Sequence, residues 1–255
     1  MMLTILGGGG WFPAHGRQTA CALYRHGARA IMIDAGTGVG RGVEQPGLLE
    51  GVEQLDIVLS HFHLDHVAGL AYLPAVGLCP QTTIWGPGSV LYGTPTHTIL
   101  EAVSHEPFHP VPLEAQDITV RDLPPDEIEL GGIRVFMRRQ DRHSAPTLGF
   151  RFEDTLAWIT DTAYDPESAA FAAGCATLAH ESWFTTARPR NREIHSSAAE
   201  AAQVANDAGI EQLLLIHLPP FQESIDALVE EARELVPLAE PAVDADYFVG
   251  STCGK

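Results

Sequence analysis

The stretch Ser60-His61-Phe62-His63-Leu64-Asp65-His66 is the most informative part of this 255-residue chain, because it places four potential metal ligands directly after a strand-like run. His61 and His63 are two positions apart, so their side chains face the same side at the end of an extended segment. Asp65 and His66 begin the next turn and can face a second ion. A solvated polar loop is the alternative, but so dense a group of ligands favours a metal site. One short loop is therefore predicted to bind two metal ions.

The order His-X-His-X-Asp-His after a strand resembles the motif of the metallo-β-lactamase-fold hydrolases. The resemblance covers nearly the whole chain and implies an α/β fold of four layers, αββα, in which two β-sheets lie between helices. It also counts Asp65 among the catalytic residues. The ligand set that it implies is His61, His63 and His143 for one metal ion, Asp65, His66 and His217 for the other, and Asp161 as the bridge between them.

Three further segments are similar to the ribonuclease Z branch of that family and its related phosphodiesterases. Residues 143–151 resemble its His-X-X-Pro-X-X-Gly-Tyr-Arg segment, residues 179–182 its His-Glu-Ala-Thr motif, and residues 195–197 its His-Ser-Thr motif. Read singly, His195 is a residue flanking a helix and Glu181 is a structural carboxylate. Their joint match implies a catalytic role, in which a histidine held by a carboxylate delivers a proton to a departing alkoxide.

The predicted ligand set suits two divalent ions and predicts a hydrolase. Imidazole and carboxylate ligands are compatible with zinc, manganese or iron, and zinc is the first choice. Two such ions lower the pKa of bound water and stabilise an anionic transition state, for carbonyl and phosphoryl substrates alike. In the same family Asp34, at the end of a strand-like run, resembles a residue that supports the ligands.

Composition predicts one domain, residues 1–255, in a reducing compartment. With 45% apolar residues the chain can form one large core, and no linker-like stretch divides it. The four cysteines, Cys21, Cys79, Cys175 and Cys253, are scattered without a Cys-X-X-Cys pair, which argues against a disulfide framework. The sequence contains no apolar run of the roughly 20 residues that a membrane span needs. A cytoplasmic protein is therefore expected.

Charge argues against a large nucleic acid as substrate. The formal net charge is -18, whereas a protein that binds a nucleic-acid backbone neutralises phosphates with Lys and Arg. In ribonuclease Z itself an RNA-binding arm lies between the ligands equivalent to His143 and Asp161, and here only residues 144–160 separate them. Arginines at 138–142 and 188–192 flank site residues in sequence. They either bind a substrate phosphate or balance surface carboxylates.

The pattern of apolar residues predicts alternating strands and helices, followed by antiparallel hairpins. Residues 7–10 are four glycines, which predict a tight turn or a close backbone approach, and a structural glycine turn near the metal site is favoured. Residues 73–125 are rich in Pro, Gly and His and are expected to shape a substrate pocket. The predicted strands are 3–6, 30–34, 55–60, 82–86, 118–123 and 213–216, the hairpins 128–137 and 149–160, and the helices 67–72, 96–103 and 198–208, the last with a capping box at its start.

The leading hypothesis is a dinuclear metal phosphodiesterase that acts on a small phosphodiester, including cyclic ones. The runner-up is a carboxyl-ester, lactone or thioester hydrolase on the same fold. Ribonuclease Z-type RNA processing and a non-catalytic metal-binding protein are the remaining alternatives. A homodimer is suggested only by resemblance. His15 and Arg17 follow the glycine run, and a structural role is favoured for both.

Overall fold

The computed structural model describes all residues except 1, 46, 78–80, 222–224, 246 and 250–255. Within the described residues the chain forms two β-sheets of seven strands each. In order, the strands of the first sheet are β14 (Tyr247–Val249), β1 (Met2–Gly7), β2 (Cys21–His26), β3 (Arg29–Ile33), β4 (Gln54–Val58), β5 (Gln81–Gly86) and β6 (Ile118–Asp122). Those of the second are β13 (Glu240–Pro241), β12 (Gln212–Ile216), β11 (Thr177–Glu181), β10 (Leu156–Ile159), β9 (Thr147–Phe152), β8 (Ile133–Gln140) and β7 (Glu127–Leu130).

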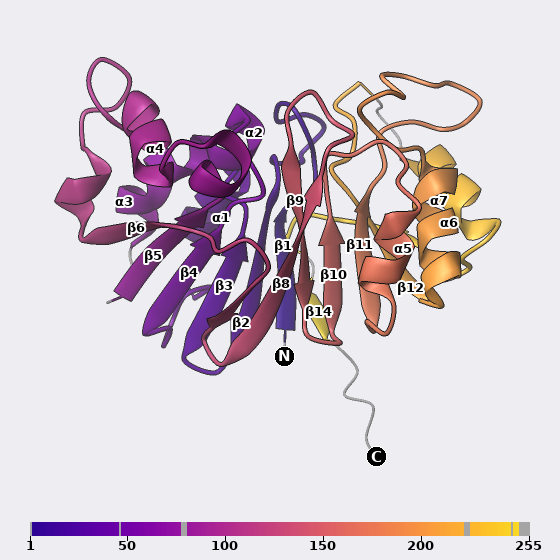
Figure 1. Cartoon of the computed structure of the whole chain (residues 1–255), viewed down its shortest axis with the longest axis horizontal. Helices are drawn as coiled ribbons and strands as arrows, with labels where there is room; N and C mark the ends of the chain where they lie inside the picture. Colours follow the sequence, from indigo (N-terminus) through magenta and orange to yellow (C-terminus); the bar gives the residue numbers. More distant parts are fainter. Residues whose placement is uncertain (1, 46, 78–80, 222–224, 246, 250–255) are drawn as a thin grey trace.

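Helices cover the outer face of each sheet, so that the four-layer αββα fold predicted from the sequence is confirmed (Figure 1). Those on the first sheet are α1 (Arg41–Glu44), α2 (Leu64–Val67), α3 (Leu73–Val76) and α4 (Thr96–Ser104). Those on the second are α5 (Glu167–Ala172), α6 (Ala198–Ala208) and α7 (Asp226–Arg233). None of these helices, in the part of the chain that is described, is long and apolar enough to cross a membrane.

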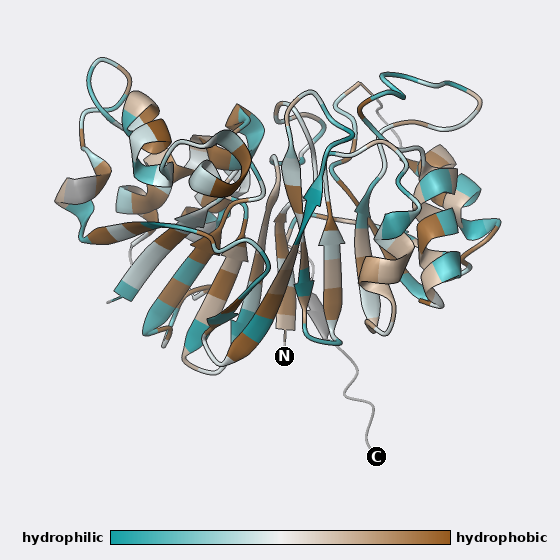
Figure 2. Cartoon of the chain, viewed as in Figure 1, coloured by the Kyte–Doolittle hydropathy of each residue, from teal (hydrophilic) through white to brown (hydrophobic). Residues whose placement is uncertain are grey.

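Three apolar layers hold the sheets and helices together. Between the sheets lie large buried side chains such as Ile31, Phe150 and Trp158. Two further clusters join each sheet to its helices, and Ile57 and Leu215 are central members of them. Figure 2 shows the corresponding hydrophobic bands along the strands of both sheets. Burial of apolar surface on both faces explains why the strands read as nearly continuous apolar runs.

Strand direction brings the predicted ligands to one edge of each sheet. Strands β3 to β6 are parallel, and β1 runs with them because β2 is antiparallel to both β1 and β3. In the second sheet β10 to β13 are parallel, and β8 runs with them because β9 is antiparallel to its two neighbours. The carboxyl ends of β4, β8, β10, β11 and β12 lead into the segments that contain the candidate site residues.

Backbone hydrogen bonds join the two sheets at that edge. The amide of Leu148 donates to the carbonyl of Ser60 at 3.0 Å, and the amide of Gly10 donates to the carbonyl of Leu218 at 3.0 Å. Gly10 has to be a glycine, because a Cβ there would meet the ring of His217 at 2.4 Å. The glycine run is therefore a close backbone approach beside the candidate metal site, and not the glycine turn that was favoured from the sequence.

Several local predictions are confirmed in detail. Gly131 and Gly132 both have positive φ, as a tight hairpin turn requires, and they join β7 to β8. Helix α6 starts with a capping box in which Ser197 and Glu200 exchange hydrogen bonds, and Gly209 ends it in the left-handed conformation.

Cys21 and Cys175 are buried free thiols, whereas Cys79 and Cys253 lie outside the described residues.

The helix predicted over 67–72 is wrong in extent and type. The chain instead forms α2, a 3₁₀ turn over Ala68–Tyr72 and then α3, which has a proline in its first turn. The carbonyl of His66 accepts a hydrogen bond from the amide of Ala35, and the amide of Gly69 donates to the carbonyl of Ala35. These bonds to a neighbouring loop replace the bonds of a regular helix. Strand β2 and helices α5 and α7 were not predicted.

Candidate metal centre

The loop after β4, residues 60–66, contains four predicted ligands and is called the ligand loop. Its side chains alternate between inward and outward orientations. His61 is fully buried, whereas the ring of Phe62 packs against Tyr92 with 5.4 Å between centroids. His63 is the residue before α2 and has extended backbone angles, so that its side chain lies on the same side as His61, with 4.4 Å between ring centroids. Leu64 is 68% exposed and points away from the loop's polar side. This alternation is what the spacing predicted.

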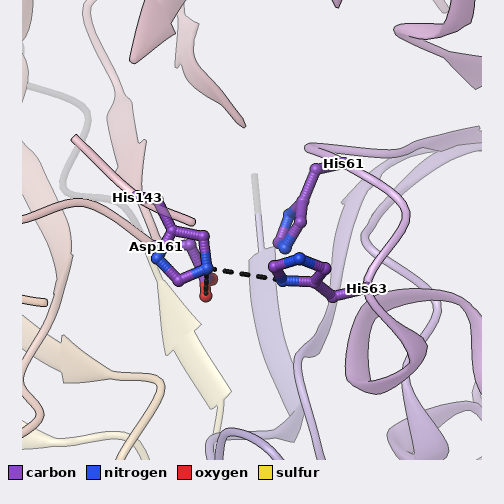
Figure 3. A group of neighbouring side chains, drawn as sticks. All are labelled: His61, His63, His143 and Asp161. Atoms are coloured by element: carbon purple, nitrogen blue, oxygen red, sulfur yellow. Dashed lines mark hydrogen bonds and ion pairs between the residues drawn. The ribbon is translucent and has the colours of Figure 1, made fainter. Parts of the chain in front are cut away.

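The first cluster consists of His61, His63, His143 and Asp161, whose side chains converge from both sheets (Figure 3). One ligand atom from each lies within 4.8 Å of all the others. The Nε2 atom of His143 lies 3.3 Å from Nδ1 of His63 and 3.5 Å from a carboxylate oxygen of Asp161. Nε2 of His61 is buried and has no hydrogen-bond partner among the described residues. Several nitrogen atoms that face one another in this way are suited to a shared cation.

The second cluster consists of Asp65, His66 and His217, again with ligand atoms within 4.8 Å of one another. Asp65 Oδ2 lies 3.2 Å from Nε2 of His217 and 3.6 Å from Nε2 of His66. The backbone amide of Trp11 also donates to this oxygen at 2.7 Å, which orients the carboxylate. His66 and Asp65 lie in the first turn of α2, whereas His217 follows β12.

Asp161 lies between the two clusters. Its Oδ1 atom is 3.4 Å from Nε2 of His217 and 3.5 Å from Nε2 of His143, and its Oδ2 atom is 3.0 Å from Nε2 of His66. The backbone of Asp161 has a φ of 51°, which turns the side chain out of the strand direction directly after β10. The surrounding imidazoles of His217 and His66 outweigh burial and hold the pKa of Asp161 well below its usual range. A carboxylate that lies within 3.5 Å of side chains from both clusters has the arrangement of a bridging ligand.

The donor set fits divalent cations. Nδ1 of His66 lies 2.8 Å from a carboxylate oxygen of Asp34 and donates its hydrogen there, which leaves the lone pair of Nε2 facing the carboxylates of Asp161 and Asp65. Lone pairs that face each other repel unless a cation or a proton lies between them. Burial alone would lower the pKa of His66, but Asp161, Asp34 and Asp65 raise it well above its usual value. The site therefore attracts positive charge.

Asp34 and Ser60 support the ligands from behind. Asp34 is fully buried and accepts hydrogen bonds from the amide and the hydroxyl of Ser60, at 2.7 and 2.9 Å, besides the bond from His66. The Oγ atom of Ser60 also lies 2.9 Å from Nδ1 of His61. Such bonds fix which ring nitrogen of each histidine faces the metal site. Asp34 therefore lies behind the ligand loop, in contact with the predicted ligand His66.

Glu181 and His195 form a hydrogen-bonded pair at the edge of the clusters. The Nδ1 atom of His195 lies 2.8 Å from Oε2 of Glu181, and Oε1 accepts a hydrogen bond from the amide of Thr162. Burial, and then the charge of Asp161, raises the pKa of Glu181 to about 8. Burial also lowers the pKa of His195. The ring of His195 stacks on Trp183 with 4.6 Å between centroids and an interplanar angle of 21°.

A cavity of about 210 Å³ opens onto residues of both clusters and onto His195. His195 lines it, and a ring nitrogen of His195 lies within 4.8 Å of ligand atoms of Asp161 and His217. The lining residues that were not predicted from the sequence are Trp11, Ser144, Trp183, Asn191 and Ile194. Trp183 had a usable signal, since it stands two residues after Glu181 and an extended chain turns both side chains to one side. The others depend on how long loops fold back.

The arginines at 138–142 make other contacts and do not line the cavity. Arg138 donates to Asp165 and to Ser168, each at 2.7 Å, so its charge is already paired. Arg139 forms a surface ion pair two residues along the chain, and Arg142 donates to a backbone carbonyl. Of the arginines at 188–192, Arg190 lies with its guanidinium carbon 5.0 Å from the ring centroid of Phe221.

Three other candidates have structural contacts. His180 is fully buried on the opposite face of β11 from Glu181, and its Nδ1 atom donates to the carbonyl of that residue. His15 and Arg17 contact the backbone carbonyls of Pro220 and Pro219, at 3.0 and 3.1 Å, and so position the segment after His217.

The segment 73–125 does not shape the metal cavity as expected, since none of its described residues lines that cavity. It contributes instead to a separate apolar cavity of about 320 Å³ between α2, α4 and the loop that follows α4.

Comparison with known proteins identifies the family. The sequence model of the family described as "Beta-lactamase superfamily domain" matches residues 29–218. The chain is 28% identical to a ribonuclease Z of Methanopyrus kandleri, over 96% of either protein. It is 30% identical to a ribonuclease Z of Mycobacterium sp. (strain KMS), over 88% of this chain and 87% of that protein.

A crystal structure of the metallo-beta-lactamase fold protein YhfI from Bacillus subtilis has the same fold, with a TM-score of 0.78 at 20% identity, over 97% of this chain and 99% of that chain. The fold and the sequence match agree with the resemblance drawn from the histidine motif. The chain therefore belongs to the beta-lactamase superfamily domain family, and it is a metal-dependent hydrolase.

Proposed function

We propose that this hydrolase is a dinuclear metal phosphodiesterase that acts on a small phosphodiester, including cyclic ones. The observation that carries the proposal is the hydrogen bond of 2.8 Å between His195 and Glu181, directly beside the metal-ligand clusters. A phosphodiester releases an alkoxide, which is a poor leaving group and needs a proton in the transition state. A hydrolase of activated esters has no such need.

The residues of the two clusters would hold the ions. We assign His61, His63 and His143 to one ion, Asp65, His66 and His217 to the other, and Asp161 to both. When bound, two divalent ions supply a coordinated water of lowered pKa and neutralise negative charge that develops on the phosphoryl oxygens. Zinc is the metal proposed first, with manganese or iron as alternatives, because imidazole and carboxylate ligands accept all three.

His195 would act as the general acid. Glu181 holds its Nδ1 atom, and Trp183 stacks on its ring, so the imidazole is held in one orientation at the cavity wall. When the imidazole carries a second proton, Nδ1 donates to Glu181, and the other ring nitrogen, Nε2, would donate its proton to the leaving oxygen of a substrate in the cavity. Proton transfer of this kind contributes roughly 10²- to 10⁴-fold to the rate of a reaction with a poor leaving group.

The cavity and the charge favour a small substrate over RNA. The cavity measures about 210 Å³, and the net charge of -18 opposes a polyanion. Residues 144–160 form mainly the hairpin of β9 and β10, which leaves no room for an RNA-binding arm. RNA processing remains the alternative that the ribonuclease Z relatives suggest. We also propose that residues 1–255 act as one domain, because the ligands come from both halves of the chain.

The test is the effect of His195→Ala on two classes of substrate. With protein reconstituted with zinc, the variant should lose about 10²- to 10⁴-fold in kcat on an alkyl phosphodiester, where the leaving group needs a proton. On an aryl phosphodiester with a nitrophenyl leaving group the loss should be below about tenfold, since that leaving group departs without help. His26→Ala, at an exposed position, is the matched control, and Asp161→Ala is the blank.

Two results would count against the proposal. Equal losses on both diesters would mean that His195 has a structural role, and metal analysis of each variant would show whether ions were lost. A wild-type protein that hydrolyses a carboxyl ester or a lactone faster than any phosphodiester would favour the alternative function, in which Glu181 and His195 have no part in proton transfer.

A further inference from the structure

Trp11, Phe12 and Phe221 form an aromatic rim beside the metal cavity. The ring of Trp11 lies edge-on to the other two, with centroid distances of 5.2 Å to Phe12 and 5.8 Å to Phe221. Phe221 in turn lies 5.5 Å from Trp183, the residue that stacks on His195. The aromatic rim is therefore continuous with the aromatic wall of the cavity.

Trp11 has the exposure and the backbone conformation of a ligand-contacting residue. Trp11 is 61% exposed, although tryptophan buries a large apolar surface when it packs in a core. Its φ is 64°, in the left-handed region that bulky residues rarely adopt. The conformation is held by the amide of Trp11, which donates to the predicted ligand Asp65. An exposed indole held in a strained conformation at a cavity that it lines is suited to contact with a bound molecule.

Arg190 adds a positive charge to this rim. Its guanidinium carbon lies 5.0 Å from the ring centroid of Phe221, as in a cation–π contact. A guanidinium offers planar stacking and several hydrogen-bond donors, in a chain whose net charge is -18. Aromatic faces next to such donors are suited to a planar ring that carries carbonyl or ring-nitrogen acceptors. Among groups that a phosphodiester can bear, a nucleobase has this chemistry.

We propose that the substrate carries a nucleobase, which stacks on Trp11 while its phosphodiester lies in the cavity beside His195. This inference rests on the proposed phosphodiesterase function and names the substrate class of the same site. Trp11 is then a residue that determines specificity and takes no part in the chemical step. A cyclic phosphodiester without a base would reach the same ions and leave the aromatic rim uncovered.

The experiment compares adenosine cyclic phosphate with glycerol cyclic phosphate, with hydrolysis by the zinc-reconstituted enzyme followed by phosphorus NMR. The wild type should prefer the adenosine compound. In Trp11→Leu the ratio of the two kcat/KM values should fall roughly tenfold, mostly through KM, because base stacking on an aromatic side chain is lost. Trp11→Phe should retain most of the preference. Phe108→Leu, at an aromatic side chain that is 75% exposed and does not line the metal cavity, is the matched control.

A second readout measures binding without catalysis. Adenosine monophosphate should quench the fluorescence of the wild type, and this quenching should be weaker in Trp11→Phe. Equal efficiency of the wild type on both cyclic phosphates, or an unchanged ratio in Trp11→Leu, would overturn the inference. A changed elution volume of Trp11→Leu in size-exclusion chromatography, with the ratio retained, would mean that the rim binds protein and would overturn it as well. Failure to hydrolyse any phosphodiester would refute the proposed function, and the quenching would still test the rim.

Discussion

Asp34 shows how one buried carboxylate organises the ligand loop. It accepts hydrogen bonds from the predicted ligand His66 and from both the amide and the hydroxyl of Ser60, and it has a φ of 56°, which Asn tolerates well. Asp34→Asn would therefore keep the backbone and lose the negative charge behind His66. Asp56→Asn is a matched control, because Asp56 is also buried, lies in the neighbouring strand β4, and accepts side-chain hydrogen bonds from Trp85 and Gln54.

Asp34→Asn is expected to weaken metal binding by roughly 10- to 100-fold, as the loss of partners behind metal ligands generally does. Titration against a competing chelator measures the affinity, and Asp56→Asn should bind metal as the wild type does. Equal weakening of metal binding in both variants would show that the effect is not specific to the contact between Asp34 and His66.

His180 makes stability depend on pH. Burial lowers its pKa to about 4 in the folded state, whereas in the unfolded chain this histidine is protonated with a pKa of 6.5. Between these values the unfolded state binds more protons, so stability is complete above pH 6.5 and decreases as the pH falls toward about 4. From about pH 7 to about pH 5 this residue should cost about 2 kcal/mol of unfolding free energy.

Urea unfolding of His180→Gln at the two pH values checks this prediction. The variant should lose less stability on acidification than the wild type, by about 2 kcal/mol, because the two proteins differ only at this histidine. His26→Gln, at an exposed position, should behave as the wild type does. If His180→Gln and the wild type lost the same unfolding free energy on acidification, His180 would not be the source of the pH dependence.

At the scale of elements, helix α6 follows directly on the segment that contains His195, and its capping box fixes where the helix begins. Ser197 accepts a hydrogen bond from the amide of Glu200, whose carboxylate accepts one from the amide of Ser197 at 2.7 Å. Ser197→Ala should lower the unfolding free energy by about 1 kcal/mol. For a chain of this size, that corresponds to a fall in melting temperature of roughly 2–4 °C.

Thermal unfolding followed by circular dichroism measures this change. Glu200→Gln is the control, because glutamine retains the reciprocal bond to Ser197, so its cost should be smaller. If Ser197→Ala melted at the wild-type temperature, the capping bonds would contribute nothing to the stability of α6.

At the scale of the whole molecule, the predicted ligands join two sheets. His61, His63, Asp65 and His66 come from the first sheet, and His143, Asp161 and His217 come from the second. Ions held by both would stabilise only the folded state, by about 2.7 kcal/mol at a metal concentration 100 times the dissociation constant. Chelation should therefore lower the melting temperature by roughly 5–10 °C.

Differential scanning calorimetry with and without chelator checks this prediction. The Asp161→Ala variant should respond less, because the carboxylate between the clusters is gone. A wild-type melting temperature that does not change on chelation would mean that the ions contribute little to the cohesion of the two sheets.

The local patterns of the sequence were sufficient for the ligand loop, the hairpin turns and the capping box. Each depends on residues close together in the chain, where backbone geometry limits what the side chains can do: alternate facing in His61 and His63, positive φ at Gly131 and Gly132. The fold class followed from the same motif through its family resemblance.

The tertiary structure decided which distant residues share the cavity. Trp11, Trp183 and Asn191 line it because loops from different strands meet at one sheet edge, and no local pattern encodes that meeting. It also decided that Arg138 binds Asp165 instead of a substrate, and that the backbone of Ala35 interrupts the predicted helix. Such outcomes follow from hydrogen bonds and ion pairs between segments far apart in sequence, whose partners become neighbours only when both sheets have packed.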